Sequence, residues 1–185
     1  MAQAEVRFRS EALGRWATYQ VLLPDEGEGP FPVVLQLHGL SDDSRCWIER
    51  SNIQRYAEET GLIVAFPDGE TSGYLNWLES GRLHRNAYED LIVKDIPGNL
   101  RRNFKVTDGP WGIGGLSMGG YGSMRIGLKH PDLFASIWSH SSAFVINEHL
   151  AHNLMDPAAL ADADCRIHAQ NLLKNTANQP VITFD

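Results

Sequence analysis

The chain has 185 residues, of which 43% are hydrophobic and 21% charged, and this composition predicts one globular domain, residues 1–185, with a core of its own. The net charge of −7 argues against nucleic acid as a partner. Residues 1–16 carry charges throughout, and no later stretch approaches the ~18 consecutive apolar residues of a membrane span. Neither a secretory signal nor a membrane partner is therefore predicted. Cys46 and Cys165 form no disulfide framework, so reduced thiols in a cytoplasmic protein are expected.

The first predicted elements are strands. Residues 5–9 and 16–23 alternate apolar and polar side chains around a turn at residues 12–14, which indicates an antiparallel hairpin. Residues 33–37 are rich in valine and leucine without strict alternation. That pattern is typical of a strand covered on both faces in a parallel sheet.

The third strand runs into the loop His38-Gly39-Leu40-Ser41. Open α/β folds keep their sites at the carboxyl edge of the sheet, and a glycine there lets the backbone turn so that the next amide faces inward. We therefore predict the Leu40 N–H as one donor of an oxyanion hole. His38 is placed beside the pocket, with its ring packed or hydrogen-bonded locally. Taken alone, the segment also fits an ordinary strand-to-helix turn.

A helix is predicted over residues 47–60, with Gly61 as its C-terminal stop, and a buried strand over residues 62–66. A second helix is predicted over residues 86–103, and Pro97 should kink it.

The long loop over residues 70–85 connects the strand predicted over residues 62–66 to the helix predicted over residues 86–103. Loops of this length over a sheet edge are usually functional, so Asn76 and Trp77 are predicted to form a wall of the acyl or alcohol pocket. Equally, Trp77 could serve only to pin the loop down by packing.

Residues 111–131 contain the strongest motif. An apolar strand over residues 111–114 is followed by the turn Gly115-Leu116-Ser117-Met118-Gly119 and by a helix over residues 120–129. This is the strand–turn–helix context of a nucleophile elbow, which predicts Ser117 as a nucleophile and the Met118 N–H as the second oxyanion donor. A side chain at either glycine of the motif would collide with the neighbouring strand or helix. The alternative is a serine in a packing turn.

The C-terminal part contributes two further predicted strands, residues 134–138 and 181–184, with helical pieces over residues 148–171. Strands and helices alternate along the chain, which predicts an α/β fold with a mostly parallel sheet. His140 follows one of these strands and is predicted to line the pocket; a role as substitute base is the less favoured alternative.

No metal site is expected. His149 and His152 are three residues apart on a possible helix, but a solvated helix face explains them better than a metal pair without a third ligand. The remaining histidines, His84, His130 and His168, have no constellation of partners in the sequence.

Several motifs in order carry a family resemblance: LHGLSDDSRCW, SNIQRYAEETGLIVAFPDG, GYLNW, YEDLIVKDIP and GLSMGGYGSMRIGLKHPDLF. Together they resemble the esterase D/tributyrin esterase group of α/β-hydrolases, which is similar to S-formylglutathione hydrolases, type 1 carbohydrate esterases and mycolyltransferases. The resemblance implies a cofactor-free serine carboxylesterase acting on small acyl esters, with Ser117 as nucleophile and the Leu40 and Met118 amides as oxyanion donors. The loop after the third strand looks more like the tributyrin-esterase branch.

The match with the family has one departure. In this fold the acid follows the seventh strand and the histidine the eighth, and residues 181–184 are the seventh strand by our count. The sequence thus predicts an α/β-hydrolase fold that lacks its last strand and helix. Asp185 is the only residue near the acid position, whereas the resemblance places the acid several residues farther on. An uncovered sheet edge would favour a homo-oligomer.

Three functions remain open from the sequence. The first is hydrolysis of short-chain or S-formylglutathione-type esters through an acyl-Ser117 intermediate. The second is a catalytically inactive α/β-hydrolase-fold module that binds an ester or a protein. The third is acyl transfer of the mycolyltransferase type, which differs from hydrolysis only in the acceptor.

Overall fold

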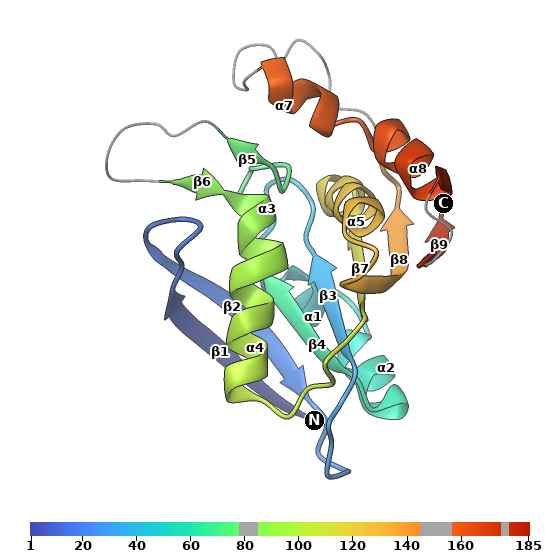
Figure 1. Cartoon of the computed structure of the whole chain (residues 1–185). Coiled ribbons are helices and arrows are strands. Elements are labelled where there is room, and N and C mark those ends of the chain that lie inside the picture. Colours follow the sequence, from blue (N-terminus) through green and yellow to red (C-terminus); the bar gives the residue numbers. More distant parts are fainter. Residues whose placement is uncertain (78–84, 145–156, 175–177) are drawn as a thin grey trace.

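The computed structural model describes residues 1–77, 85–144, 157–174 and 178–185. Its main feature is a seven-stranded sheet in the order β1-β2-β4-β3-β7-β8-β9 (Figure 1). β1 pairs antiparallel with β2, and β2 with β4, whereas the remaining neighbours are parallel. The predicted hairpin and parallel sheet are confirmed. The strands are β1 Ala2–Arg9, β2 Trp16–Leu23, β3 Val33–Leu37, β4 Ile63–Pro67, β7 Trp111–Leu116, β8 Phe134–His140 and β9 Val181–Phe184.

The strand order positions the site. β3 and β7 are separated by more than 70 residues of chain, yet they are neighbours, with Leu37 opposite Gly115. Because both strands run in the same direction, the loop after β3 and the turn after β7 begin side by side at one edge of the sheet. β9 is the edge strand at the opposite side of the sheet from β1. It pairs with β8, where Ser139 lies opposite Phe184.

The predicted helix over residues 47–60 is wrong in one respect, because the structure divides it into α1 Cys46–Arg50 and α2 Ile53–Thr60. Ser51 is extended between them. Its hydroxyl donates to the Trp47 carbonyl and accepts the Ile53 N–H, so this side chain competes with the helical backbone pattern. Gly61 ends α2 in the left-handed conformation, as predicted.

The helix predicted over residues 86–103 begins after β6 Asn86–Ala87, which pairs with β5 Asn76–Trp77. The chain passes through α3 Tyr88–Asp90, a π-helical stretch Leu91–Asp95 and α4 Ile96–Asn103. The irregularity lies directly before Pro97, which occupies the first turn of α4. Proline has no N–H to donate, and the π-helical stretch is how the chain accommodates it.

Helices cover both faces of the sheet (Figure 1). α4 and α5 Met118–Lys129 pack on one face with the larger core, which includes Tyr19, Leu35 and Ile126. α1 and α2 cover the other face with a smaller cluster around Phe66. Of the helical pieces expected over residues 148–171, α7 Pro157–Asp162 and α8 Cys165–Lys174 are described, and α8 packs on α5. Among the described residues, no helix is long and apolar enough to cross a membrane.

Candidate active site

Ser117 occupies a strand-to-helix turn. β7 ends at Leu116 and α5 begins at Met118, so the turn is one residue long. Ser117 is exposed and has φ 53° and ψ −113°, a backbone conformation that residues with side chains rarely adopt. Three hydrogen bonds hold it: its N–H donates to the His140 carbonyl, and its carbonyl accepts the Tyr121 N–H and the Ser142 hydroxyl. The strained serine is therefore fixed by its neighbours.

The glycines of the motif are there because the turn leaves no room for a side chain. A Cβ at Gly115 would lie 2.5 Å from the carbonyl carbon of Gly119. A Cβ at Gly119 would lie 2.4 Å from the Leu37 carbonyl oxygen and 2.6 Å from that of His38. These distances are below any real Cβ contact and involve backbone atoms that cannot rotate away. The G-x-S-x-G spacing thus brings α5 against the end of β3.

The loop after β3 approaches the serine at Gly39. A Cβ there would lie 3.9 Å from the Ser117 Cβ and 3.5 Å from the Leu116 carbonyl oxygen. Leu40, the expected oxyanion donor, follows Gly39, and the residue is 60% exposed. Met118 is the first residue of α5, where N–H groups have no partner within the helix. Both predicted donors therefore belong to backbone that borders Ser117.

His38 connects two loops at the edge of the sheet. Its side chain is buried, and both ring nitrogens are engaged: Nδ1 lies 2.8 Å from the Gly39 carbonyl oxygen, and the Gly69 N–H donates to Nε2 over 2.8 Å. The predicted local hydrogen bonding is observed, and the ring links the loops after β3 and β4; the place of His38 beside a substrate pocket stays a prediction.

Asn76 and Trp77 also make structural contacts. Trp77 Nε1 donates to the Ser72 carbonyl over 2.7 Å, which ties down its own loop. The Asn76 side chain exchanges two hydrogen bonds with Asp90, one with the carboxylate and one with the backbone N–H. These contacts favour the alternative in which Trp77 anchors the loop, and the role of either residue as a pocket wall stays a prediction.

His140 and Asp185 form a pair that sequence reasoning did not find. His140 Nδ1 lies 2.5 and 2.7 Å from the two carboxylate oxygens of Asp185, and the imidazole stacks on Trp138. The signal for this pair was the parallel pairing of β8 with β9, which places their last residues together. A carboxylate on Nδ1 orients an imidazole as in a catalytic triad. However, no hydrogen bond joins Ser117 Oγ to an imidazole within the described ranges.

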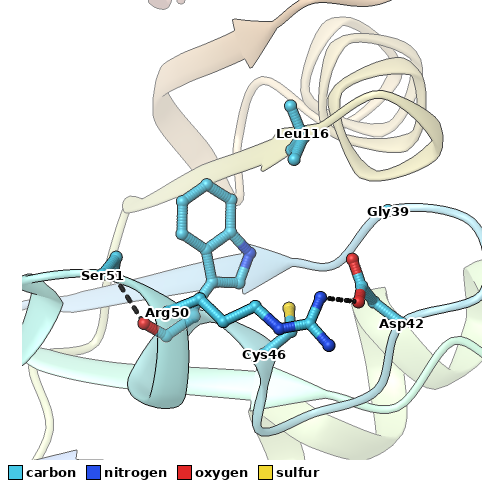
Figure 2. A pocket seen from close by; sticks show the side chains of 7 residues that line it. Gly39, Asp42, Cys46, Arg50, Ser51 and Leu116 are labelled. Atoms are coloured by element: carbon cyan, nitrogen blue, oxygen red, sulfur yellow. Dashed lines mark hydrogen bonds and ion pairs between the residues drawn. The ribbon is translucent and has the colours of Figure 1, made fainter.

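A cavity of about 170 Å³ opens beside the site on the α1 side of the sheet. It is lined by Gly39, Asp42, Cys46, Trp47, Arg50, Ser51 and Leu116. Figure 2 shows Arg50 reaching to Asp42 next to Cys46, with Leu116 on the opposite side; the Arg50–Asp42 ion pair spans 2.6 Å. Ser117 is not among the lining residues, so the cavity neighbours the nucleophile without containing it.

The two cysteines are free, and both are buried. Burial raises the pKa of the Cys46 thiol to about 11 and that of Cys165 to about 12. Because the thiolate is the reactive form, we expect both thiols to react with the reagent dithiobis(nitrobenzoate) at pH 8 at least roughly 100-fold more slowly than free cysteine. The absorbance of the released thiolate measures the rate, and unfolding in urea should restore the ordinary rate. Rapid reaction of both thiols in the native protein would contradict their burial.

A buried cluster of charged side chains joins α5 to α3 and α7. Arg125 on α5 is fully buried and pairs with Glu89 at 2.5 Å and with Asp162 at 2.9 Å. Lys129 and His130 also contact Glu89, at 3.0 and 2.9 Å. Burial opposes ionisation of Glu89, but hydrogen bonds from His130 and the Arg125 charge outweigh it, so the pKa lies well below its ordinary value of 4.5.

The cluster corrects the expectation that His130 and His168 have no partners. His168 Nε2 lies 2.8 Å from the Asp162 carbonyl oxygen, and His130 bonds Glu89. His84, His149 and His152 lie outside the described residues, so the structure does not test the solvated helix face expected for the last two. Within the part of the chain that the structure describes, no group of three or more His, Cys, Asp or Glu side chains could hold a metal ion.

Comparison with known proteins bears on the family and the fold. A family model described as "Putative esterase" matches residues 10–182. FphF of Staphylococcus aureus, a fluorophosphonate-binding serine hydrolase, is similar with a TM-score of 0.83 at 22% identity, covering 99% of this chain and 78% of that chain. An S-formylglutathione hydrolase from Agrobacterium tumefaciens is similar with a TM-score of 0.85 at 21% identity, covering 99% of this chain and 85% of that chain. MPT51 of Mycobacterium tuberculosis is similar with a TM-score of 0.65 at 24% identity, covering 78% of this chain and 52% of that chain. These likenesses confirm the predicted α/β-hydrolase fold.

Proposed function

Because the chain belongs to the esterase family whose model matches residues 10–182, we propose that it is a serine carboxylesterase that hydrolyses small acyl esters through an acyl-Ser117 intermediate. The observation that carries the proposal is the exposed Ser117 with φ 53° in the one-residue turn between β7 and α5. This turn leaves Ser117 exposed at the sheet edge, beside the backbone segments of Leu40 and Met118, to whose amides we assign the developing oxyanion.

In the proposed reaction Ser117 Oγ attacks the ester carbonyl carbon, and the carbonyl oxygen becomes negative as the tetrahedral intermediate forms. The Leu40 and Met118 N–H groups stabilise that oxygen. The intermediate collapses to an acyl-serine and releases the alcohol or thiol, and water then hydrolyses the acyl-serine. No step of this sequence requires a cofactor.

The hydroxyl proton of Ser117 needs a base. Among the described histidines, His140 has its backbone carbonyl bonded to the Ser117 N–H and its Nδ1 bonded to the Asp185 carboxylate. This arrangement leaves Nε2 as the proton acceptor. Substitution of His140 by alanine tests the role: a loss equal to that of Ser117→Ala would identify the base, and retained reaction would exclude it.

The first experiment is labelling of the folded protein with a fluorophosphonate, followed by mass spectrometry of the modified peptide. We expect one adduct, on Ser117, and none in Ser117→Ala, because an unactivated serine does not react with this reagent. Ser136→Ala is the matched control, since it removes another exposed serine hydroxyl, on β8, and it should be labelled like the native protein. If the folded protein shows no Ser117 adduct, the esterase proposal is wrong and the binding module remains.

The ester class is the second question for the same protein. Comparison of p-nitrophenyl acetate, p-nitrophenyl butyrate and S-formylglutathione as substrates separates the short-chain esterase from the formylglutathione type, and an added alcohol acceptor would reveal acyl transfer. The cytoplasmic location expected from the sequence, and a homo-oligomer formed through the exposed Val181 and Phe184 of β9, stay predictions.

A further inference from the structure

Tyr74, in the loop between β4 and β5, contacts the loop that follows β3. Its side chain is fully buried, and its hydroxyl donates to the His38 carbonyl over 3.1 Å. The phenol ring meets the His38 imidazole edge-on, with ring centroids 5.9 Å apart. Tyr74 also has φ 57°, which is unfavourable for a residue with a side chain. The surroundings therefore impose this conformation.

Contacts on every side hold Tyr74 in place. Its N–H donates to the Ser72 hydroxyl over 3.0 Å, and its carbonyl accepts from Arg125 Nη2 over 3.1 Å. Two glycines make room for the ring, because a Cβ at Gly69 would lie 2.3 Å from the ring and one at Gly122 would lie 2.6 Å from it. The hydroxyl is thereby directed at the His38 carbonyl group in the neighbouring loop after β3.

The His38 ring holds the following carbonyl. Since the Gly69 N–H donates to Nε2, the ring proton is on Nδ1, which donates to the Gly39 carbonyl oxygen. That oxygen also accepts the Asp42 N–H over 3.2 Å. The peptide between Gly39 and Leu40 is planar and trans, so its N–H points opposite to its C=O. The bonds that hold the Gly39 carbonyl therefore set the direction of the Leu40 N–H.

We propose that Tyr74 and His38 are positioning residues for the Leu40 oxyanion donor: Tyr74 fixes the carbonyl of His38, and His38 fixes the carbonyl of Gly39. This inference rests on the proposed function for its kinetic part. An oxyanion donor works only when it is already aimed at the place where charge develops. Loss of the His38 bond lets the Gly39–Leu40 peptide rotate, and loss of the Tyr74 bond frees the His38–Gly39 peptide that precedes it. In either case the donor loses its aim without any change in the groups that bind substrate.

The first test is Tyr74→Phe, which removes the hydroxyl and keeps the ring between the two glycines. Loss of a whole oxyanion donor lowers kcat by roughly 100- to 1,000-fold. We expect a misdirected donor to lower kcat for p-nitrophenyl butyrate by about 10-fold or more, with KM unchanged. The matched control is Tyr19→Phe, which removes another buried hydroxyl, bonded to Asn99 on α4, and should leave kcat unchanged. Equal kcat in the two variants would overturn the role of Tyr74.

The second test separates the two nitrogens of His38. In His38→Asn the side-chain amide can reach the Gly39 carbonyl as Nδ1 does, whereas in His38→Gln it can reach the Gly69 N–H as Nε2 does. We expect the asparagine variant to keep kcat within about 3-fold and the glutamine variant to lose about 10-fold or more. Equal losses in both variants would mean that the ring has a structural role only.

A readout that does not depend on catalysis accompanies both tests. Amide hydrogen exchange of the peptide spanning residues 38–42 reports on the loop itself. We expect it to be about 10-fold faster in Tyr74→Phe and His38→Gln than in Tyr19→Phe and His38→Asn. If Ser117 is unreactive in the native protein, the proposed function fails and exchange alone decides the positioning role. Unchanged exchange in Tyr74→Phe and His38→Gln would overturn that role whether or not Ser117 reacts.

Discussion

Replacement of Arg125 by methionine is expected to lower the free energy of unfolding by about 3 kcal/mol, since removing one partner of a buried ion pair leaves the other charge uncompensated. The Arg125 side chain is fully buried and that of Glu89 is 5% exposed. Methionine fills much of the space of the arginine stem, so the loss reports on charge rather than on a cavity. Lys129 and His130 still contact Glu89, and this keeps the loss at the lower end of the usual range. Urea unfolding followed by circular dichroism measures it.

Two further measurements separate the charge effect from general damage. Lys94→Met, which breaks the exposed pair with Asp90, should cost less than about 0.5 kcal/mol. The double variant Arg125→Met/Glu89→Leu should be more stable than Arg125→Met alone, because it removes a buried carboxylate that has lost its fully buried partner. If the double variant were the weaker one, the buried charge would not be the cause.

The same pair gives a pH dependence with a defined sign. The pKa of Glu89 is depressed in the folded state, so its stabilisation is present above the ordinary glutamate pKa and is lost as pH falls below it. We expect the stability difference between the native protein and Arg125→Met to narrow as pH decreases from about 5 toward 3. A difference that stayed constant over this interval would show that Glu89 does not titrate with the pair.

The strand, turn and helix around Ser117 could be predicted from the sequence because their determinants are local. An apolar strand, two glycines on either side of a serine and a helix follow one another within about 20 residues, and each carries its own steric or periodic signature. The parallel pairing of most strands was predictable for a related reason, since buried apolar runs that alternate with helices imply a parallel sheet. Ser117 and the seven-stranded sheet follow from such patterns.

The ion cluster and the His140–Asp185 pair could not be found in that way. Glu89 and Arg125 are 36 residues apart, and His140 and Asp185 are 45 apart. No periodicity connects such positions, because only the packing of α3 against α5, or of β8 against β9, brings them together. The same limit applies to His38: the motif placed it near the site, but the loop after β4 decides that both of its nitrogens are engaged.

Substitution of Gly119 by alanine is expected to destabilise the protein by about 3 kcal/mol or more, because overpacking against backbone that cannot move aside is the costly case. The new methyl group would lie 2.4 Å from the Leu37 carbonyl oxygen and 2.6 Å from that of His38. Alanine is otherwise the better helix former by about 1 kcal/mol, so helix propensity predicts the opposite sign. Only the clash between α5 and the end of β3 makes the change unfavourable.

Gly98→Ala provides the matched control, because a Cβ at this glycine of α4 meets nothing within 4 Å. It should stabilise the protein by roughly 0.5–1 kcal/mol, so the two substitutions differ in sign as well as in size when both are followed by urea unfolding.

The clash at Gly119 also pushes α5 away from the carbonyl groups of Leu37 and His38, and it therefore separates Ser117 from the loop that carries Leu40. Fluorophosphonate labelling of whatever Gly119→Ala remains folded should accordingly fall along with stability. Stability and labelling equal to those of the native protein would mean that the loop after β3 can retreat by about an ångström without consequence, and a steric origin of the motif would then be wrong.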